Sequence, residues 1–289
     1  MCNIHTHSTR NLDTLSDPTR TITLRSRFAG GFRKRFREFR GLIRKAIIEQ
    51  DVFAISSGMG GNPGLQNQEL STYQGSVPGP EAFDFPRIQG KISAFMEWLQ
   101  KQEDRVILEV GNRQRIGESI EQTWQNVFIE DSYKRGVQRA SFEMGRQQFP
   151  NFSSIETRGG IAAVMSSPFH VDRMGVVFTR AFNELKGITD AMDQQISRIL
   201  AQGLADGDGP RLLARKLNST ISGKGLGDLG IRDSLGRFIP AQRRAEILAR
   251  TEVIRAHHQG MFQEYKNFRV QGVNVQAEFR TAGARNVCL

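Results

Sequence analysis

The chain has 289 residues, a formal net charge of +10, 29 glycines and only two cysteines. No run approaches the roughly 18 uncharged apolar residues that a membrane-spanning helix needs, so we expect none. The polar start MCNIHTHSTRN lacks the apolar stretch of a secretory signal, and Cys2 and Cys288 lie at opposite ends. A disulfide framework is therefore not expected, and a reducing compartment fits the composition.

Almost all of the net positive charge lies in one segment near the N-terminus. Residues 20–45 contain ten Lys or Arg residues and a single acid, Glu38. A local excess of this size indicates a polyanionic neighbour, such as nucleic acid, an acidic protein surface or a membrane surface.

The same segment has the spacing of an amphipathic helix. Its apolar face is formed by Phe28, Phe32, Phe36, Phe39, Ile43 and Ile47. Next to this face lies a basic group made of Arg33, Lys34, Arg35, Arg37, Arg40, Arg44 and Lys45. Two interpretations stay open: the basic side chains are only solvated, or they contact DNA phosphates or an acidic partner. Binding to a membrane surface is a third.

A Gly/Pro-rich linker is expected next, over residues 56–90, because this density of Gly and Pro breaks helices and strands alike. Beyond it, the apolar spacing predicts five helices, over residues 92–99, 120–144, 171–199, 212–217 and 240–268. Residues 149–168 are expected to form a loop. The run GKGLGDLG (223–230) is expected to be a flexible turn, because it lacks the GK[ST] ending of a phosphate-binding loop.

The expected fold class is mainly α, with long amphipathic helices, extended arms and a small C-terminal β element. The β element is predicted near residues 273–281, where apolar and polar residues alternate. We divide the chain into a basic N-terminal arm and helix (1–55), the linker (56–90), a helical body (91–268) and a short β element with the C-terminus (269–289).

Catalytic signatures are missing from the sequence. There is no paired-carboxylate pattern, no GxSxG and no HExxH, so we do not expect an enzyme. Cys2, His5 and His7 have a spacing too tight for a convincing metal site at a chain terminus. No metal and no cofactor are therefore expected.

The run ILARTEVIRAHHQG (247–260) places polar residues inside the last predicted helix. Spacing predicts a single buried face formed by Ile247, Thr251, Ile254, His258, Met261, Tyr265 and Phe268. Thr251 and His258 would then need hydrogen-bond partners from a backbone carbonyl or a neighbouring helix. We expect Glu252 to pair with Arg255, and Glu246 with Arg250, on the flank of the helix. The pattern favours a packing seam over a catalytic cluster.

The same helix carries a resemblance to a known family. LARTEVIRAHHQGMFQEYKNF, followed by VNVQAEFRTAGARNVCL, resembles the C-terminal signature of the phage Mu F-like head-morphogenesis proteins, which are minor capsid proteins of tailed phages. The matching positions are Ala249, Arg250, Thr251, Glu252, Arg255, Ala256, His257, Gly260, Thr281, Ala282, Arg285, Val287 and Cys288. Two earlier segments, FRGLIRKAIIEQDVF (39–53) and WQNVFIEDSYKRGVQRA (124–140), are similar to the N-terminal halves of these proteins.

The resemblance implies a low-copy structural protein of the phage head. Such a protein would be assembled in the host cytoplasm, lie inside the virion near the portal vertex, and act in procapsid assembly, DNA packaging or ejection. Its implied partner is the portal protein, with major capsid protein or scaffold and packaged double-stranded DNA as further candidates and no membrane in the assembled head. Structural roles are implied for Arg250, Thr251, Glu252, Arg255, His258, Thr281 and Cys288.

The sequence departs from the family at two places. Phe279 stands where the family usually has Trp, and no second cysteine follows Cys288, so no zinc site is expected here.

The alternative function is that of a DNA-binding accessory protein that acts outside the capsid through the basic helix over residues 20–45.

Overall fold

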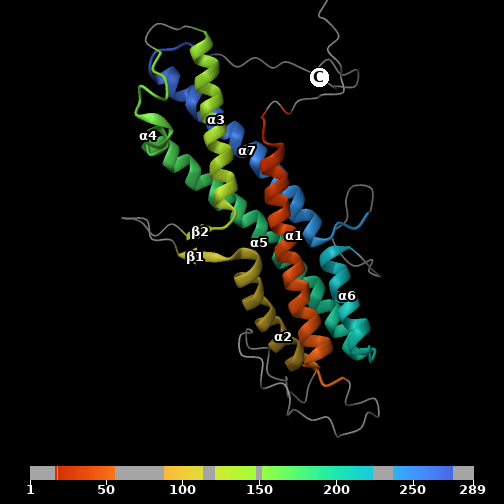
Figure 1. The fold of residues 1–289 in the computed structure, drawn as a ribbon. Helices are drawn as coiled ribbons and strands as arrows, with labels where there is room; N and C mark the ends of the chain where they lie inside the picture. Colours follow the sequence, from red (N-terminus) through yellow and green to blue (C-terminus); the bar gives the residue numbers. More distant parts are fainter. Residues whose placement is uncertain are drawn as a thin grey trace, which may run out of the picture. The chain divides into compact units, whose positions relative to one another are not determined.

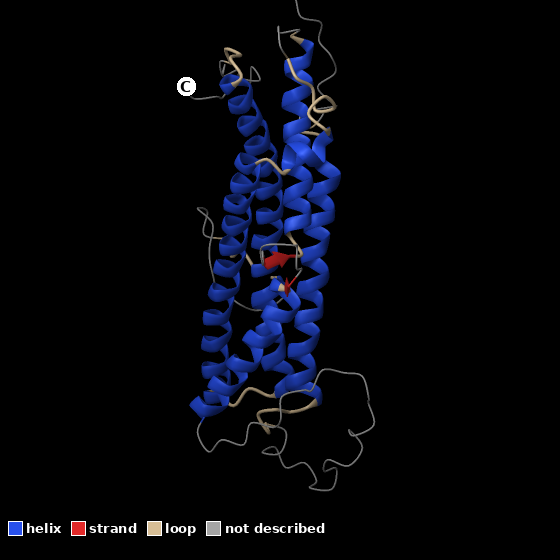
Figure 2. Cartoon of the chain, turned by 90° about the vertical axis from the view of Figure 1, so that its left-hand side faces the viewer, coloured by secondary structure: helices blue, strands red, loops and turns tan. Residues whose placement is uncertain are grey.

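The computed structural model describes residues 17, 19–55, 88–112, 121–147, 152–223 and 237–275. Over these residues the chain is mainly helical, with one pair of short strands, as Figures 1 and 2 show. This confirms the mainly α class expected from the sequence. The elements in order are α1 (Ile22–Arg44), the π-helix η1 (Lys45–Glu49), α2 (Ile88–Glu103), the π-helix η4 (Asp104–Leu108), β1 (Val110–Asn112), β2 (Glu121–Thr123), α3 (Asn126–Arg146), α4 (Gly160–Met165), α5 (Pro168–Ala205), α6 (Pro210–Ser222) and α7 (Ala241–Val270).

The chain divides into two compact units. We call residues 20–128 with 178–252 the α1 unit, and residues 1–19 with 129–177 and 253–289 the α4 unit. Helices α3, α5 and α7 contribute residues to both units. Within the α1 unit, α1 packs on α2, η4 and α6.

The phenylalanine face of α1 forms much of the core of the α1 unit. All six apolar residues predicted to share this face are buried, Leu24 extends the face toward the N-terminus, and Ala29 is buried beside Phe28. Phe28 stacks on Phe32 and on Phe128, with ring centroids 5.0 Å and 4.8 Å apart, and meets Trp124 edge-on. The predicted amphipathic helix is therefore confirmed, because large apolar residues at gaps of three and four define one face clearly.

A β-hairpin occupies a region where the sequence predicted the start of a helix at residue 120. Antiparallel strands β1 and β2 pair Val110 with Thr123, and α3 begins only at Asn126. The turn between β2 and α3 is held by side chains. Thr123 donates a hydrogen bond to Asn126 Oδ1 (3.0 Å), and Trp124 Nε1 donates to the carbonyl of Ile107 (2.9 Å).

A short helix, α4, lies within residues 149–168, which were expected to be a loop. Gly159 and Gly160 both have φ +87°, a left-handed backbone that glycine adopts without strain. Gly159 directly precedes the helix and Gly160 is its first residue, so glycines that signalled a loop in the sequence instead mark a helix start. At its C-terminal end, Ser166 and Ser167 hydroxyls donate to the carbonyls of Ala163 and Val164.

The other predicted helices are present with longer bounds. The predicted helix over residues 171–199 becomes α5, in which apolar residues from Val177 to Leu200 supply the buried face while Val171 is 41% exposed. Helix α6 begins at Pro210, a residue suited to a first helical turn, and α7 begins one residue after Pro240.

Several predictions lie outside the described residues. They concern the linker over 56–87, the glycine-rich run after Gly223, the N-terminal Cys2, His5 and His7, and residues 276–289. The part of the expected C-terminal strand that is described, residues 273–275, has no strand structure.

Helices α3 and α7 come into backbone contact within the α4 unit. A methyl group at Gly136 would lie 2.9 Å from the carbonyl carbon of His257 and collide with its oxygen. Reciprocally, a methyl group at Gly260 would lie 3.1 Å from the carbonyl carbon of Tyr133 and collide with that oxygen. The Ser132 hydroxyl donates a hydrogen bond to the Val253 carbonyl (2.6 Å), which adds a polar link at the same crossing.

A buried polar chain joins α3, α5 and α7 in the same unit. The Tyr133 hydroxyl and His170 Nδ1 are 2.9 Å apart, and His170 Nε2 lies 3.2 Å from Glu264. Arg158 also donates to this carboxylate. Burial would raise the pKa of Glu264, but the hydrogen bonds from His170 and Arg158 outweigh it, so the pKa lies below its usual value. Each buried polar group thus has a partner, which stabilises the unit.

The glycine crossing gives a stability prediction. Gly136→Ala or Gly260→Ala should lower the free energy of unfolding by about 2 kcal/mol or more, because the new methyl group meets backbone that cannot move aside. Thermal or urea unfolding of the full chain would measure this.

A matched control lies in the same unit. Gly175 is an exposed glycine of α5 with no atom within 4 Å of an added methyl group. Gly175→Ala should raise the free energy of unfolding by about 0.5–1 kcal/mol, because alanine favours the helix. Equal effects of Gly175→Ala and Gly136→Ala would contradict the close crossing.

Candidate nucleic-acid interface

The side of α1 opposite its phenylalanine face exposes a row of cations. Arg33, Lys34, Arg37 and Arg44 are exposed, and none of them forms an ion pair with another described residue. We call these four residues the basic face. Because α1 is anchored by its buried side, the basic face is held on an ordered helix and stays available to a partner.

Arg35 has a different environment from its neighbours. Its guanidinium lies over the Trp124 ring, 3.8 Å from the centroid, and forms an ion pair with Glu109. Glu109 ends η4 in a left-handed conformation, with φ 41°. This arrangement ties α1 to the η4 turn and to the segment before α3. Arg35 was predicted to contact DNA or an acidic partner, but its guanidinium is already engaged within the protein.

Arg40 and Lys45 are half-buried at the edge of the basic face. Burial lowers the pKa of Arg40, and the nearby Arg37 lowers it further. The buried Arg40 Nε has no hydrogen-bond partner among the described residues. Positive charges on this part of α1 therefore repel one another, which favours the approach of an anion.

Helix α6 adds basic residues that the sequence patterns did not single out. It packs beside α1 in the α1 unit (Figure 1) and exposes Arg211 and Arg215. Lys216 is engaged by Asp208, 2.5 Å away. In the sequence, the signal for Arg211 and Arg215 was their spacing of four residues. That they lie on a helix packed beside α1 is known only from the tertiary structure.

The chemical composition of the basic face determines what it can recognise. Arginine and lysine bind phosphate oxygens, whereas adenine is usually read by Asn or Gln. Helix α1 contains eight Lys or Arg residues and no Asn or Gln. The face therefore suits the phosphate backbone of a nucleic acid, and it lacks the Asn and Gln side chains that usually read adenine.

The family-motif residues of α7 occupy a face that differs from the prediction. Ile247 is 43% exposed, and Thr251 and His258 are exposed, although all three were predicted to be buried. The buried face is shifted by about one position and consists of Ala245, Leu248, Ala249, Glu252, Val253, Ala256, His257, Gly260, Glu264 and Phe268. Four of these ten residues are Ala or Gly and three are Glu or His, so a search for large apolar residues selected the wrong side of the helix.

The polar contacts of this helix also differ in part. Thr251 Oγ1 donates to the Ile247 carbonyl (3.1 Å), which is the type of bond expected, although it lies at the surface. Glu246 interacts with Arg243 and Gln242 instead of Arg250. Glu252 is buried, not on the flank.

Buried His257 is the histidine that sequence reasoning passed over in favour of His258. Its Nδ1 has no hydrogen-bond partner among the described residues, and burial lowers its pKa, with His258 lowering it further. A neutral imidazole is thus favoured at this position. Thr281 and Cys288, the two motif residues of the C-terminal segment with an implied structural role, lie outside the described residues.

Comparison with known proteins adds no relative, since no family model, curated protein or solved structure matches the chain. In the part of the chain that the structure describes, none of the helices combines the length and apolar character needed to cross a bilayer. The resemblance to the head-morphogenesis proteins therefore rests on the residues that carry it.

Two adjacent cations of α1 provide a test of these assignments. Arg35→Gln should lower the free energy of unfolding by about 1–2 kcal/mol, because it removes the stack on Trp124 and the ion pair with Glu109. Lys34→Gln should change it by no more than about 0.5 kcal/mol, because Lys34 is exposed. Urea unfolding would measure both, and similar losses in the two variants would contradict the separate roles.

Proposed function

We propose that this chain is a structural minor capsid protein of a tailed phage, associated with the portal and active in head assembly and in DNA packaging or ejection. The observation that carries the proposal is the basic face: four exposed cations without ion-pair partners among the described residues, on a helix anchored by a buried phenylalanine face. The resemblance of α7 and the C-terminal segment to the head-morphogenesis signature supports the location in the phage head.

In this proposal the basic face contacts the phosphates of packaged double-stranded DNA. Each Lys or Arg that neutralises a phosphate releases condensed counterions, so binding is favourable and strongly dependent on salt. Because α1 is already folded and packed, little conformational entropy is lost when DNA binds. Contacts to phosphates carry no sequence information, which suits a protein that meets any sequence of the genome.

A DNA-binding accessory protein outside the capsid remains the second candidate. The same observation favours it, because the basic face by itself does not specify where the DNA lies. The two functions differ in whether the protein is part of the particle and in whether it binds the portal.

The phosphate contact has a quantitative signature in the salt dependence of DNA binding. The slope of log K against log salt is negative. The double variant Arg33→Gln/Arg37→Gln should reduce its magnitude by about 1.8, since each lost phosphate contact removes about 0.9. Fluorescence anisotropy with two duplexes of unrelated sequence would measure the slope, and both duplexes should give the same value.

The matched control removes the same net charge elsewhere in the α1 unit. Lys101 and Lys186 are exposed residues of α2 and α5. Lys101→Gln/Lys186→Gln should leave the slope nearly unchanged. An equal loss in both double variants would indicate a diffuse effect of net charge and would remove the case for the basic face.

The location in the phage head is tested on particles. Purified procapsids and virions should contain the chain, and imaging of the portal vertex without imposed icosahedral symmetry should place it there. Arg33→Gln/Arg37→Gln should still enter procapsids if portal binding and DNA binding use different surfaces. Absence of the chain from particles, with DNA binding retained, would favour the accessory protein instead.

A further inference from the structure

Helix α6 carries a second row of cations in the α1 unit. Arg211 and Arg215 are exposed, and neither forms an ion pair with another described residue. The third cation of this helix, Lys216, is instead engaged by Asp208, 2.5 Å away. Residues four apart are neighbours on one side of a helix, so Arg211 and Arg215 form a single exposed row, which we call the α6 row.

The packing of α6 determines the direction in which the α6 row points. Leu213 and Leu217 are fully buried, and each lies about 200° around the helix from one of the two arginines. Leu213 also lies close to Gly203 of α5, where an added methyl group would be 2.7 Å from the leucine Cδ1 atom. The α6 row is therefore held away from the core on a helix whose other side is tightly packed.

The α6 row adjoins the basic face of α1. The two helices pack side by side (Figure 1), and packed helices lie roughly 8–10 Å apart. Each helix buries its apolar side in the core of the same unit, so their exposed sides meet solvent next to one another. Helix α6 has three Lys or Arg residues and no acid, while α1 has eight and a single acid, Glu38. Together they present a broad surface of positive charge.

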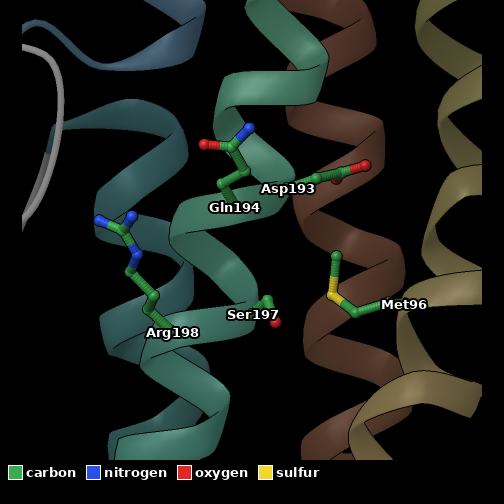
Figure 3. Close-up of a pocket in the computed structure, with 5 residues that line it drawn as sticks. All are labelled: Met96, Asp193, Gln194, Ser197 and Arg198. Atoms are coloured by element: carbon green, nitrogen blue, oxygen red, sulfur yellow. The ribbon is translucent and has the colours of Figure 1, made fainter.

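A depression lined by residues of α2 and α5 in the same unit lacks such a concentration of charge. Its lining residues are Met96, Asp193, Gln194, Ser197 and Arg198, so its one cation shares the walls with an acid. Figure 3 shows Arg198 and Asp193 projecting from different sides of α5. The paired rows of α1 and α6 are therefore the better candidate for holding a polyanion.

The surface formed by α1 and α6 suits a duplex better than a single strand. Proteins that bind single strands stack the bases on exposed aromatic side chains. Helix α6 contains no aromatic residue, and the four phenylalanines of α1 are buried. Two neighbouring rows of cations can contact two phosphate backbones, which a duplex has and a single strand lacks.

We propose that α1 and α6 bind one nucleic-acid duplex together, with Arg211 and Arg215 contacting phosphates of the same molecule that the basic face contacts. This inference rests on the proposed DNA contact and extends it to a second helix. Both helices are already folded and packed in one unit, so binding orders side chains and little else. The α6 row adds its counterion release to that of the basic face, which makes the affinity more dependent on salt.

The salt dependence of duplex binding by the full chain tests the contribution of α6. The α6 double variant, Arg211→Gln/Arg215→Gln, should reduce the magnitude of the slope of log K against log salt by about 1.8. Combined with the α1 double variant, Arg33→Gln/Arg37→Gln, the loss should be about 3.6. Arg211→Lys/Arg215→Lys keeps both charges and should keep the slope. Fluorescence anisotropy would measure each slope, and an unchanged Tm would confirm that each variant is folded.

The comparison with α1 separates this inference from the proposed function. If the α6 double variant keeps the full slope while the α1 double variant loses part of it, the role of α6 is overturned and the DNA contact of the basic face stands. If neither variant loses slope, both are overturned. Lys101→Gln/Lys186→Gln removes the same net charge and should leave the slope nearly unchanged; a loss equal to that of the α6 double variant would also overturn the role of α6.

Titration to saturation tests whether one duplex contacts both helices. A short duplex should bind with one molecule per chain, in the unmodified protein and in either double variant. Two duplexes per chain, one of which is lost in each double variant, would indicate separate sites and overturn the shared surface. A single strand of the same length should bind more weakly than the duplex at equal salt, and equal affinity would overturn the assignment of a duplex as the ligand.

Discussion

Burial of the phenylalanine face of α1 determines which side of that helix meets solvent. Phe28 packs against Trp124 and Phe128, and α1 also contacts α2, η4 and α6. A helix anchored in this way cannot rotate without exposing several large aromatic side chains, each of which contributes about 1.5–3 kcal/mol when buried. The basic face is therefore held outward by the core behind it, and the core determines the position of the charged surface.

This constraint separates cations that look equivalent in the sequence. Arg33, Lys34, Arg37 and Arg44 point away from the core and are exposed, while Arg35 lies over Trp124 and pairs with Glu109. An exposed cation contributes little to stability and much to long-range attraction of a polyanion. A cation stacked on an aromatic ring contributes more to stability and less to the long-range attraction of a polyanion. The basic segment thus serves both the fold and the candidate interface.

Sequence reasoning succeeded where large apolar side chains repeat with helical spacing and failed where tertiary contacts decide. The face of α1 was predicted residue by residue because phenylalanine at gaps of three and four has one interpretation. The hairpin of β1 and β2 was missed because its pairing joins segments eight residues apart that carry no strong alternation. The role of Arg35 depends on Trp124 and Glu109, which are distant in sequence, and no local pattern reports them.

The error on α7 explains what the family-like motif does in this chain. Ala249, Glu252, Ala256, His257 and Gly260 belong to the motif and are all buried. At Gly260 the α3 backbone approaches so closely that a methyl group does not fit, and Gly136 has the same restriction on the other helix. Small residues are required at such a crossing whatever the protein binds. The motif residues therefore serve the packing of α7, and the DNA contact proposed for this chain has to come from a different surface, the basic face of α1.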